Sequence, residues 1–162
     1  MSFALWLTGL PASGKSAIAR ELVRLLHERG IDLSVLESDV MRTQLTPHAR
    51  YDDADRDLFY GALADIGCLL VDKGRNVLFD ATANRRAYRD AARRRIASFA
   101  EVYVDTPLEI CIARDPKGLY RGGMKIPYEP PLAAELVLSG ERGTPADNAG
   151  SVVAFLVQRH WI

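Results

Sequence analysis

The chain has 162 residues, and its 21 basic side chains balance 21 acidic ones. This length predicts a single domain, spanning residues 1–162, that is large enough to bury an apolar core. A net charge of zero argues against the broad positive field that attracts nucleic acids or anionic membranes, so neither is predicted as a partner. The sequence enters a strand without a signal peptide and has no stretch of roughly 20 apolar residues, which predicts a soluble cytoplasmic protein.

The run GLPASGKS, from Gly9 to Ser16, follows an apolar segment and precedes an amphipathic one. This is the P-loop pattern in its strand–loop–helix setting, and a chance glycine-rich turn is the alternative. Glycines let backbone N–H groups approach phosphate oxygens, and the helix that follows adds its positive end. Lys15 is predicted to reach the β- and γ-phosphates, and the Ser16 hydroxyl to hold Mg²⁺. The residues predicted to bind the nucleoside triphosphate are Gly9, Leu10, Pro11, Ala12, Ser13, Gly14, Lys15, Ser16 and Ala17.

Beyond the P-loop, short apolar runs alternate with segments of helical periodicity. Helices are predicted at 17–29, 40–45, 55–73, 107–114 and 147–161, with a further helix between 80 and 101. Strands are predicted at 3–7, 33–36, 76–80, 101–105 and 136–138. The alternation predicts a three-layer α/β domain of the P-loop NTPase type with about five parallel strands. Residues 115–131, rich in Gly, Pro and Arg, are predicted to form a mobile loop.

Two of these helices have a predicted inner side. In the helix at 55–73, the apolar residues on one side are Leu58, Ala62, Ile66 and Leu69. In the helix before residue 101, the inner side carries Tyr88, Ala92 and Ile96, and the arginines on another side are Arg86, Arg89 and Arg93. We predict that this arginine side is solvated.

Two aspartates follow predicted strands, at the edge where parallel sheets bind ligands. Asp39 is predicted to orient an acceptor hydroxyl or accept its proton, with an N-cap of the helix at 40–45 as the alternative. Asp80 is predicted to contact Mg²⁺ through its water shell or the bound substrate, and a turn-capping role is the alternative. Arg42 and Arg56 are predicted to clamp an anionic acceptor, unless they are ordinary solvated arginines.

Together with the P-loop and Asp39, four segments carry a resemblance to the adenylylsulfate (APS) kinase family. They are the opening run 3–10, the segment PLEICIARDPKGLY at 107–120, and the segments PYEPP at 127–131 and ELVL at 135–138. The resemblance covers nearly the whole chain. It implies a nucleotide-kinase-like fold and transfer of the γ-phosphate of ATP, with Mg²⁺, to the 3′-hydroxyl of APS, giving PAPS.

The resemblance also implies site residues. Asp39 matches the second aspartate of an Asp-Gly-Asp signature, and Arg42 and Arg56 match acceptor-binding arginines. Tyr51 stands where a phenylalanine stacks on the APS adenine. The residues implied on the ATP side are Arg114, Lys117 and Arg121. Family members are often dimers, so a homodimer is a further expectation.

This chain departs from the family mainly on the acceptor side. Phe59 replaces an asparagine expected to contact APS, Gly61 and Ala62 replace two arginines, and Ala83 replaces a serine. The loop between Arg121 and Pro127 is shorter and lacks a phenylalanine that would face the adenine. Three alternatives therefore remain: a kinase of the same fold acting on another nucleotide conjugate or anionic small metabolite, a nucleotide-binding regulatory protein, and a polynucleotide kinase.

Overall fold

The computed structural model describes residues 1–121 and 127–162, and within them the chain forms one five-stranded parallel sheet. The strand order across the sheet is β2-β3-β1-β4-β5. The strands are β1 (Ala4–Thr8), β2 (Leu33–Glu37), β3 (Asn76–Asp80), β4 (Phe99–Asp105) and β5 (Leu136–Ser139). The predicted fold class is confirmed, with strand bounds within two residues of those expected.

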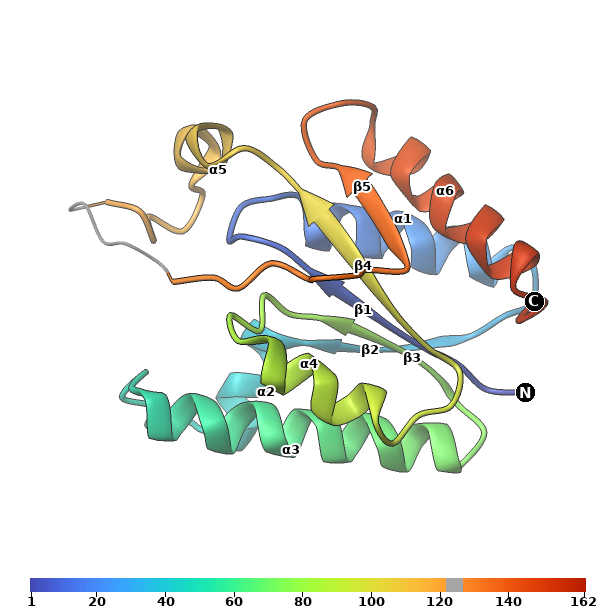
Figure 1. The fold of residues 1–162 in the computed structure, drawn as a ribbon, viewed down its shortest axis with the longest axis horizontal. Coiled ribbons are helices and arrows are strands. Elements are labelled where there is room, and N and C mark those ends of the chain that lie inside the picture. Colours follow the sequence, from blue (N-terminus) through green and yellow to red (C-terminus); the bar gives the residue numbers. More distant parts are fainter. Residues whose placement is uncertain (122–126) are drawn as a thin grey trace.

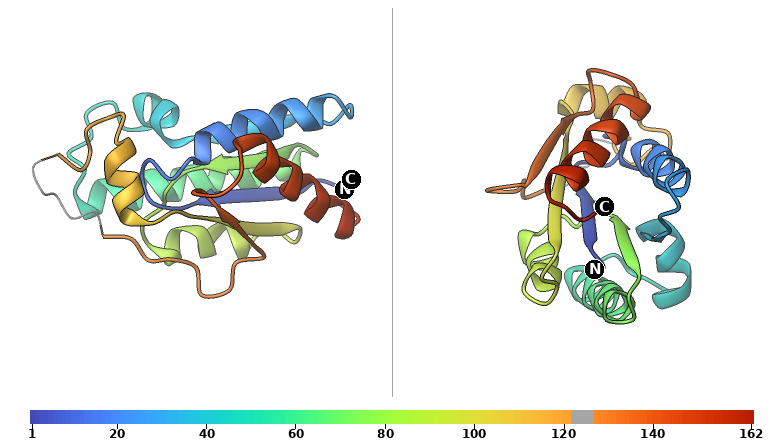
Figure 2. Two further views of the ribbon diagram at one scale, coloured as in Figure 1. Left: turned by 90° about the horizontal axis from the view of Figure 1, so that it is seen from above. Right: turned by 90° about the vertical axis from the view of Figure 1, so that its right-hand side faces the viewer.

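Helices cover both faces of this sheet, so the domain has three layers (Figure 1). The helices are α1 (Lys15–His27), α2 (Ser38–Leu45), α3 (Asp53–Asp72), α4 (Arg86–Arg93), α5 (Leu108–Arg114) and α6 (Pro145–Gln158). One apolar core lies between the sheet and the α1–α6 pair, and a second lies between the sheet and the α3–α4 pair. Figure 2 shows the layers from above and end-on, with the two termini at the same end of the domain. Among the described residues, no helix is long and apolar enough to cross a membrane.

The central strand β1 sets the position of the P-loop. All five of its residues are buried, because β3 and β4 flank it and helices cover both of its faces. This double coverage explains why the strand reads as an unbroken apolar run. At the neighbouring strand ends, Glu37 of β2 is in register with Asp80 of β3. The carboxyl ends of three strands thus meet beside the P-loop.

The predicted inner side of α3 is partly wrong, because only Ile66 of its four residues packs against the apolar core. Leu58 and Leu69 are 66% and 58% exposed, and the buried residues are Phe59, Tyr60, Leu63, Ala64, Gly67 and Cys68. Two apolar rows run along this helix, and the row with the aromatic rings has the larger area to remove from water. Gly67 also favours burial of this row. An added Cβ at this position would lie 2.0 Å from Cζ of Phe79, so only glycine lets the helix pack this closely against that ring.

The predicted solvated side of α4 is also partly wrong. Arg89 is 0% exposed and donates through Nε to Glu101 of β4 and through Nη2 to the backbone oxygen of Glu129, at 2.7 Å. Arg93 is one-third exposed and pairs with both Glu101 and Glu135. A buried guanidinium needs such partners to offset its desolvation. The network ties α4 and β4 to the segment 127–135.

The N-cap alternative for Asp39 is wrong as well. Helix α2 begins at Ser38, two residues earlier than predicted, and Glu37 occupies the N-cap position without a side-chain hydrogen bond. Asp39 therefore lies in the first turn of α2, where a negative charge meets the positive end of the helix.

Candidate active site

A cavity of about 440 Å³ lies at the carboxyl edge of the sheet. It lies between the P-loop, the start of α2 and the chain after α5. The lining residues are Pro11, Ala12, Ser13, Gly14, Lys15, Ser16, Ala17, Arg20, Glu37, Ser38, Asp39, Asp80, Thr82, Arg114, Asp115, Pro116, Lys117 and Leu119. Most of the predicted P-loop residues and both predicted aspartates thus face one space.

Two glycines allow the P-loop its path. An added Cβ on Gly9 would lie 2.6 Å from the backbone oxygen of Val104, so only glycine lets the loop pass β4 this closely. Gly14 has a φ of +103° and caps α1 without any side-chain hydrogen bond. The N–H groups of the first turn of α1 are therefore not capped by a side chain, as an anion site at a helix start requires.

Lys15 lies beneath the loop, where its ammonium group is largely buried. Its Nζ donates to the backbone oxygens of Gly9, at 3.0 Å, and Leu10, at 2.9 Å. Burial lowers the pKa of Lys15 from 10.5 to about 8, although the nearby Asp80 carboxylate acts in the opposite direction. Neutral carbonyl oxygens hold this ammonium, so a phosphate oxygen entering the loop would offer it a stronger partner.

Ser16 and Asp80 form a pair of oxygen groups next to Lys15. The Ser16 hydroxyl donates to Oδ2 of Asp80 at 2.8 Å. Burial raises the pKa of Asp80, while the hydrogen bond from Ser16 and the charge of Lys15 oppose this shift. A hydroxyl and a carboxylate are hard oxygen ligands of the kind Mg²⁺ prefers, and this pair fits a site that also takes ligands from water and phosphate.

Asp39 faces the P-loop from the start of α2 and forms an ion pair with Lys117, which follows α5. The side chains of Asp39 and Lys117 are both more than half exposed. An ion pair this exposed contributes little free energy, so either charged group can readily exchange its partner for a charged ligand. The resemblance implied Lys117 on the ATP side, and the structure places its ammonium against the predicted acceptor aspartate.

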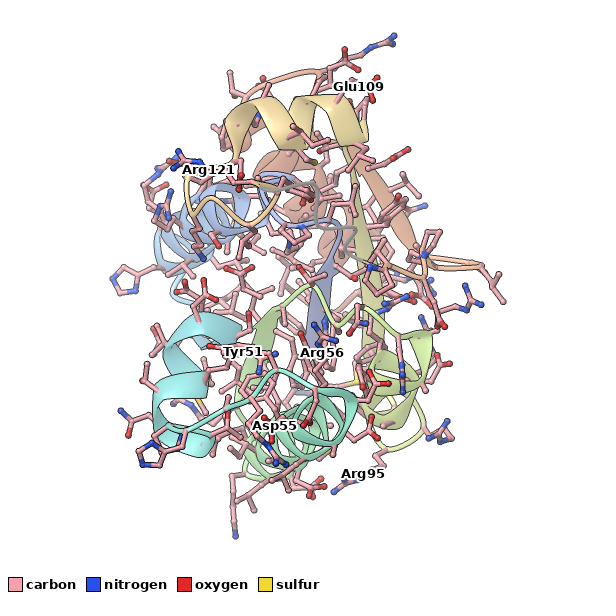
Figure 3. All side chains as sticks on the ribbon, turned by 90° about the vertical axis from the view of Figure 1, so that its left-hand side faces the viewer. Tyr51, Asp55, Arg56, Arg95, Glu109 and Arg121 are labelled. Atoms are coloured by element: carbon pink, nitrogen blue, oxygen red, sulfur yellow. The ribbon has the colours of Figure 1, made fainter. Side chains whose placement is uncertain are left out.

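The other two residues implied on the ATP side differ in their position. Arg114 lines the cavity, and its Nη2 donates to the backbone oxygen of Gly140 at 2.8 Å. Arg121 is exposed and does not line the cavity. Figure 3, which looks onto the carboxyl edge of the sheet, places Arg121 far from Tyr51 and Arg56. Of the predicted loop at 115–131, residues 122–126 lie outside the described part of the chain.

The structure does not bring the remaining acceptor-side residues to the cavity wall. Tyr51 is 57% exposed, with a φ of +60°. Nη1 of Arg56 lies 3.8 Å from Oδ1 of Asp53, three residues earlier on α3. Arg42 stacks on aromatic rings, with its Cζ 4.1 Å from the ring centroid of Phe59. None of these three residues lines the cavity: Arg42 lies on α2, Arg56 on α3, and Tyr51 in the connection between the two helices.

Several functional positions were missed by the sequence reasoning. Arg20 lines the cavity one helical turn after Ser16, and this spacing could have identified it. Thr106 and Tyr120 support the P-loop from outside by donating to the backbone oxygens of Ser13 and Pro11, each at 2.8 Å. No local pattern marks Thr106 or Tyr120, because each contact joins segments about 90 or more residues apart.

Comparisons with known proteins agree with this geometry. The family model described as adenylylsulphate kinase matches residues 1–139. An adenylyl-sulfate kinase from Klebsiella pneumoniae is 41% identical over 150 residues, covering 85% of this chain and 75% of the relative. One from a Shewanella species is 38% identical over 164 residues, covering 94% and 80%.

A solved structure supports the same relationship. The structure of the Mycobacterium tuberculosis APS kinase in complex with AMPPNP and APS superposes with a TM-score of 0.88 and 35% identity. The match covers 96% of this chain and 98% of that one.

Proposed function

This chain belongs to the adenylylsulphate kinase family, and we propose that it transfers the γ-phosphate of ATP to the 3′-hydroxyl of APS, giving PAPS and ADP. The observation that carries the proposal is the shared cavity, which is lined by Lys15 of the P-loop, Asp39 of α2 and Asp80 at the end of β3. The relatives support APS as the acceptor, and the residues of the cavity support transfer of a phosphoryl group.

On the donor side, the P-loop amides and Lys15 would bind the β- and γ-phosphates. Lys15 would leave the carbonyl oxygens of Gly9 and Leu10 for phosphate oxygens and neutralise charge that builds up during transfer. Arg114 lines the same cavity and would add a second cation there. Phosphoryl transfer needs little covalent help from a protein, so positioning and charge would supply most of the rate.

Ser16 and Asp80 are the residues that would hold magnesium. Magnesium held there would supply positive charge that offsets the negative charge of the phosphates. Asp80 is held by the Ser16 hydroxyl at 2.8 Å, so its carboxylate is already oriented toward the loop.

On the acceptor side, Asp39 would face the 3′-hydroxyl. Its carboxylate would take the hydroxyl proton as the new P–O bond forms and the bond between the γ-phosphorus and the β–γ bridging oxygen breaks. Lys117 must first leave Asp39, and the γ-phosphate would provide its alternative partner. Arg42, Arg56 and Tyr51 would bind the remainder of APS.

The test is an acceptor screen with the purified chain. We expect ADP release and PAPS formation with ATP, magnesium and micromolar APS. Shikimate, gluconate and a 5′-hydroxyl oligonucleotide serve as comparison acceptors of other classes. Release of ADP with one of these and none with APS would replace the proposed acceptor, and ATP binding without transfer to any of them would favour a regulatory protein.

From the family resemblance we also propose a homodimer. Sedimentation equilibrium should then give twice the 17.9 kDa mass of the chain. A mass of one chain at micromolar concentration would contradict this proposal without affecting the proposed reaction.

A further inference from the structure

Arg42 has an unusual environment for an arginine beside a binding cavity. Its Cζ lies 4.1 Å from the ring centroid of Phe59, 5.2 Å from that of Tyr51 and 5.6 Å from that of Tyr60. Its Nη1 is buried and has no hydrogen-bond partner among the described residues. A buried donor without an acceptor costs free energy, so an anion that reached this N–H group after a small shift of the side chain would gain a hydrogen bond without breaking one.

Phe59 itself cannot touch a ligand, because it is 0% exposed. The family resemblance implied a contact between APS and an asparagine at this position. In this chain the residue lies beneath Arg42 instead. A ring face holds a guanidinium through its π-electrons and uses none of its five N–H donors, whereas a carboxylate partner would occupy two of them.

The ring beneath Arg42 is fixed to the strand edge. Phe59 packs edge-to-face on Tyr60, with ring centroids 5.1 Å apart. The Tyr60 hydroxyl accepts a hydrogen bond from the backbone N–H of Ala83 at 3.2 Å, in the loop that follows β3 and Asp80. The orientation of Arg42 is thereby tied to the same edge of the sheet that carries Asp80.

We propose that Phe59 is a positioning residue that presents Arg42 to an oxyanion of the acceptor, the sulfate or phosphate group of a nucleotide conjugate. Arg42 lies three residues after Asp39 on α2, so the two side chains share one side of the helix. An anion bound to Arg42 would hold the acceptor hydroxyl beside Asp39. This inference rests on the proposed function and adds to it the residue that prepares the acceptor site.

The test replaces the ring and measures acceptor binding without transfer. In Phe59→Leu, which keeps an apolar side chain but removes the ring face, calorimetry with APS should show about tenfold weaker binding. The affinity for AMPPNP should stay within about twofold of the original. Phe59→Tyr keeps a ring and should restore most of the APS affinity. If Phe59→Leu does not fold, Phe59→Met takes its place.

A matched control exists elsewhere in the same chain. At the C-terminal end of α6, across the sheet from α3, Arg159 stacks on Phe155 with its Cζ 5.2 Å from the ring centroid. Phe155→Leu removes the same kind of contact away from the cavity and should leave APS binding unchanged. In the background of Arg42→Ala, the change Phe59→Leu should weaken APS binding no further, because the ring acts only through Arg42.

The outcomes separate this inference from the proposed function. Equal APS affinity in Phe59→Leu and Phe155→Leu overturns the role of Phe59, as does an equal loss of APS and AMPPNP binding. An unaltered chain without affinity for APS overturns it too. Binding of APS without formation of PAPS contradicts the proposed reaction alone.

Discussion

On the donor side of the cavity, Lys15 and Ser16 are held by short contacts within the P-loop and to Asp80, whereas on the acceptor side Asp39 and Tyr51 are more than half exposed. The donor side is built mostly from backbone and buried polar groups of one contiguous segment. The acceptor side is built from side chains of α2, α3 and the chain after α5. The proposed phosphate-binding loop is thus ordered without its ligand, whereas Asp39 and Tyr51 on the proposed acceptor side remain open to solvent.

The largest expected effect is on the donor side. In Lys15→Ala, turnover with APS should fall by about 1,000-fold or more, because a preorganised cation near the transferred phosphate is lost. ADP release with saturating substrates measures the change. Lys73→Ala, at the end of α3, removes a lysine outside the cavity and should have no effect. Near-normal turnover in Lys15→Ala would remove the donor side from the proposed chemistry.

The second prediction distinguishes the proposed acceptor side of the cavity from the proposed donor side. In Asp39→Asn, kcat should fall by about 100-fold, since the amide cannot take the hydroxyl proton. ATP affinity, measured by calorimetry, should stay within about twofold. Asp65→Asn is the matched control, because Asp65 is an exposed aspartate paired with an arginine away from the cavity. Loss of ATP binding equal to the loss of turnover would place Asp39 on the donor side.

A smaller effect concerns pH and the donor side. The ligand-free pKa of Lys15 is about 8, so the ammonium that attracts phosphate is mostly protonated at pH 7 and mostly neutral at pH 9. ATP affinity should therefore fall about tenfold between pH 7 and pH 9, one factor of ten per pH unit above the pKa. Calorimetry in buffers with different ionisation enthalpies should also show proton uptake on binding at pH 9.

Lys15→Ala is the control for this pH dependence and should lose it. Equal ATP affinity of the original chain at pH 7 and pH 9 would mean that the pKa of Lys15 lies well above 9.

The smallest expected effect tests the exposed part of the acceptor side. In Tyr51→Ala, the KM for APS should rise about fivefold, the lower end of base stacking, because this side chain is more than half exposed to solvent. Tyr51→Phe keeps the ring and should leave KM unchanged. Steady-state kinetics with varied APS measures both variants, and a change in KM for ATP instead would move Tyr51 to the donor side.

The sequence by itself determined the five strands, most helix bounds to within about three residues, and most of the P-loop residues that line the cavity. These patterns are local: the P-loop is one short segment, and each strand or helix shows its periodicity within its own residues. The strand-end positions of Asp39 and Asp80 were also predictable, because parallel strands bring their carboxyl ends to one edge.

Only the tertiary structure decided which row of α3 is buried, that Arg89 pairs with Glu101 inside the domain, and that Arg42 stacks on Phe59. Two apolar rows on one helix are equivalent in sequence until a partner such as Phe79 fits against one of them. The ion pair between Asp39 and Lys117 joins residues 78 positions apart. Contacts of this kind depend on which distant segments meet, and no local periodicity encodes that.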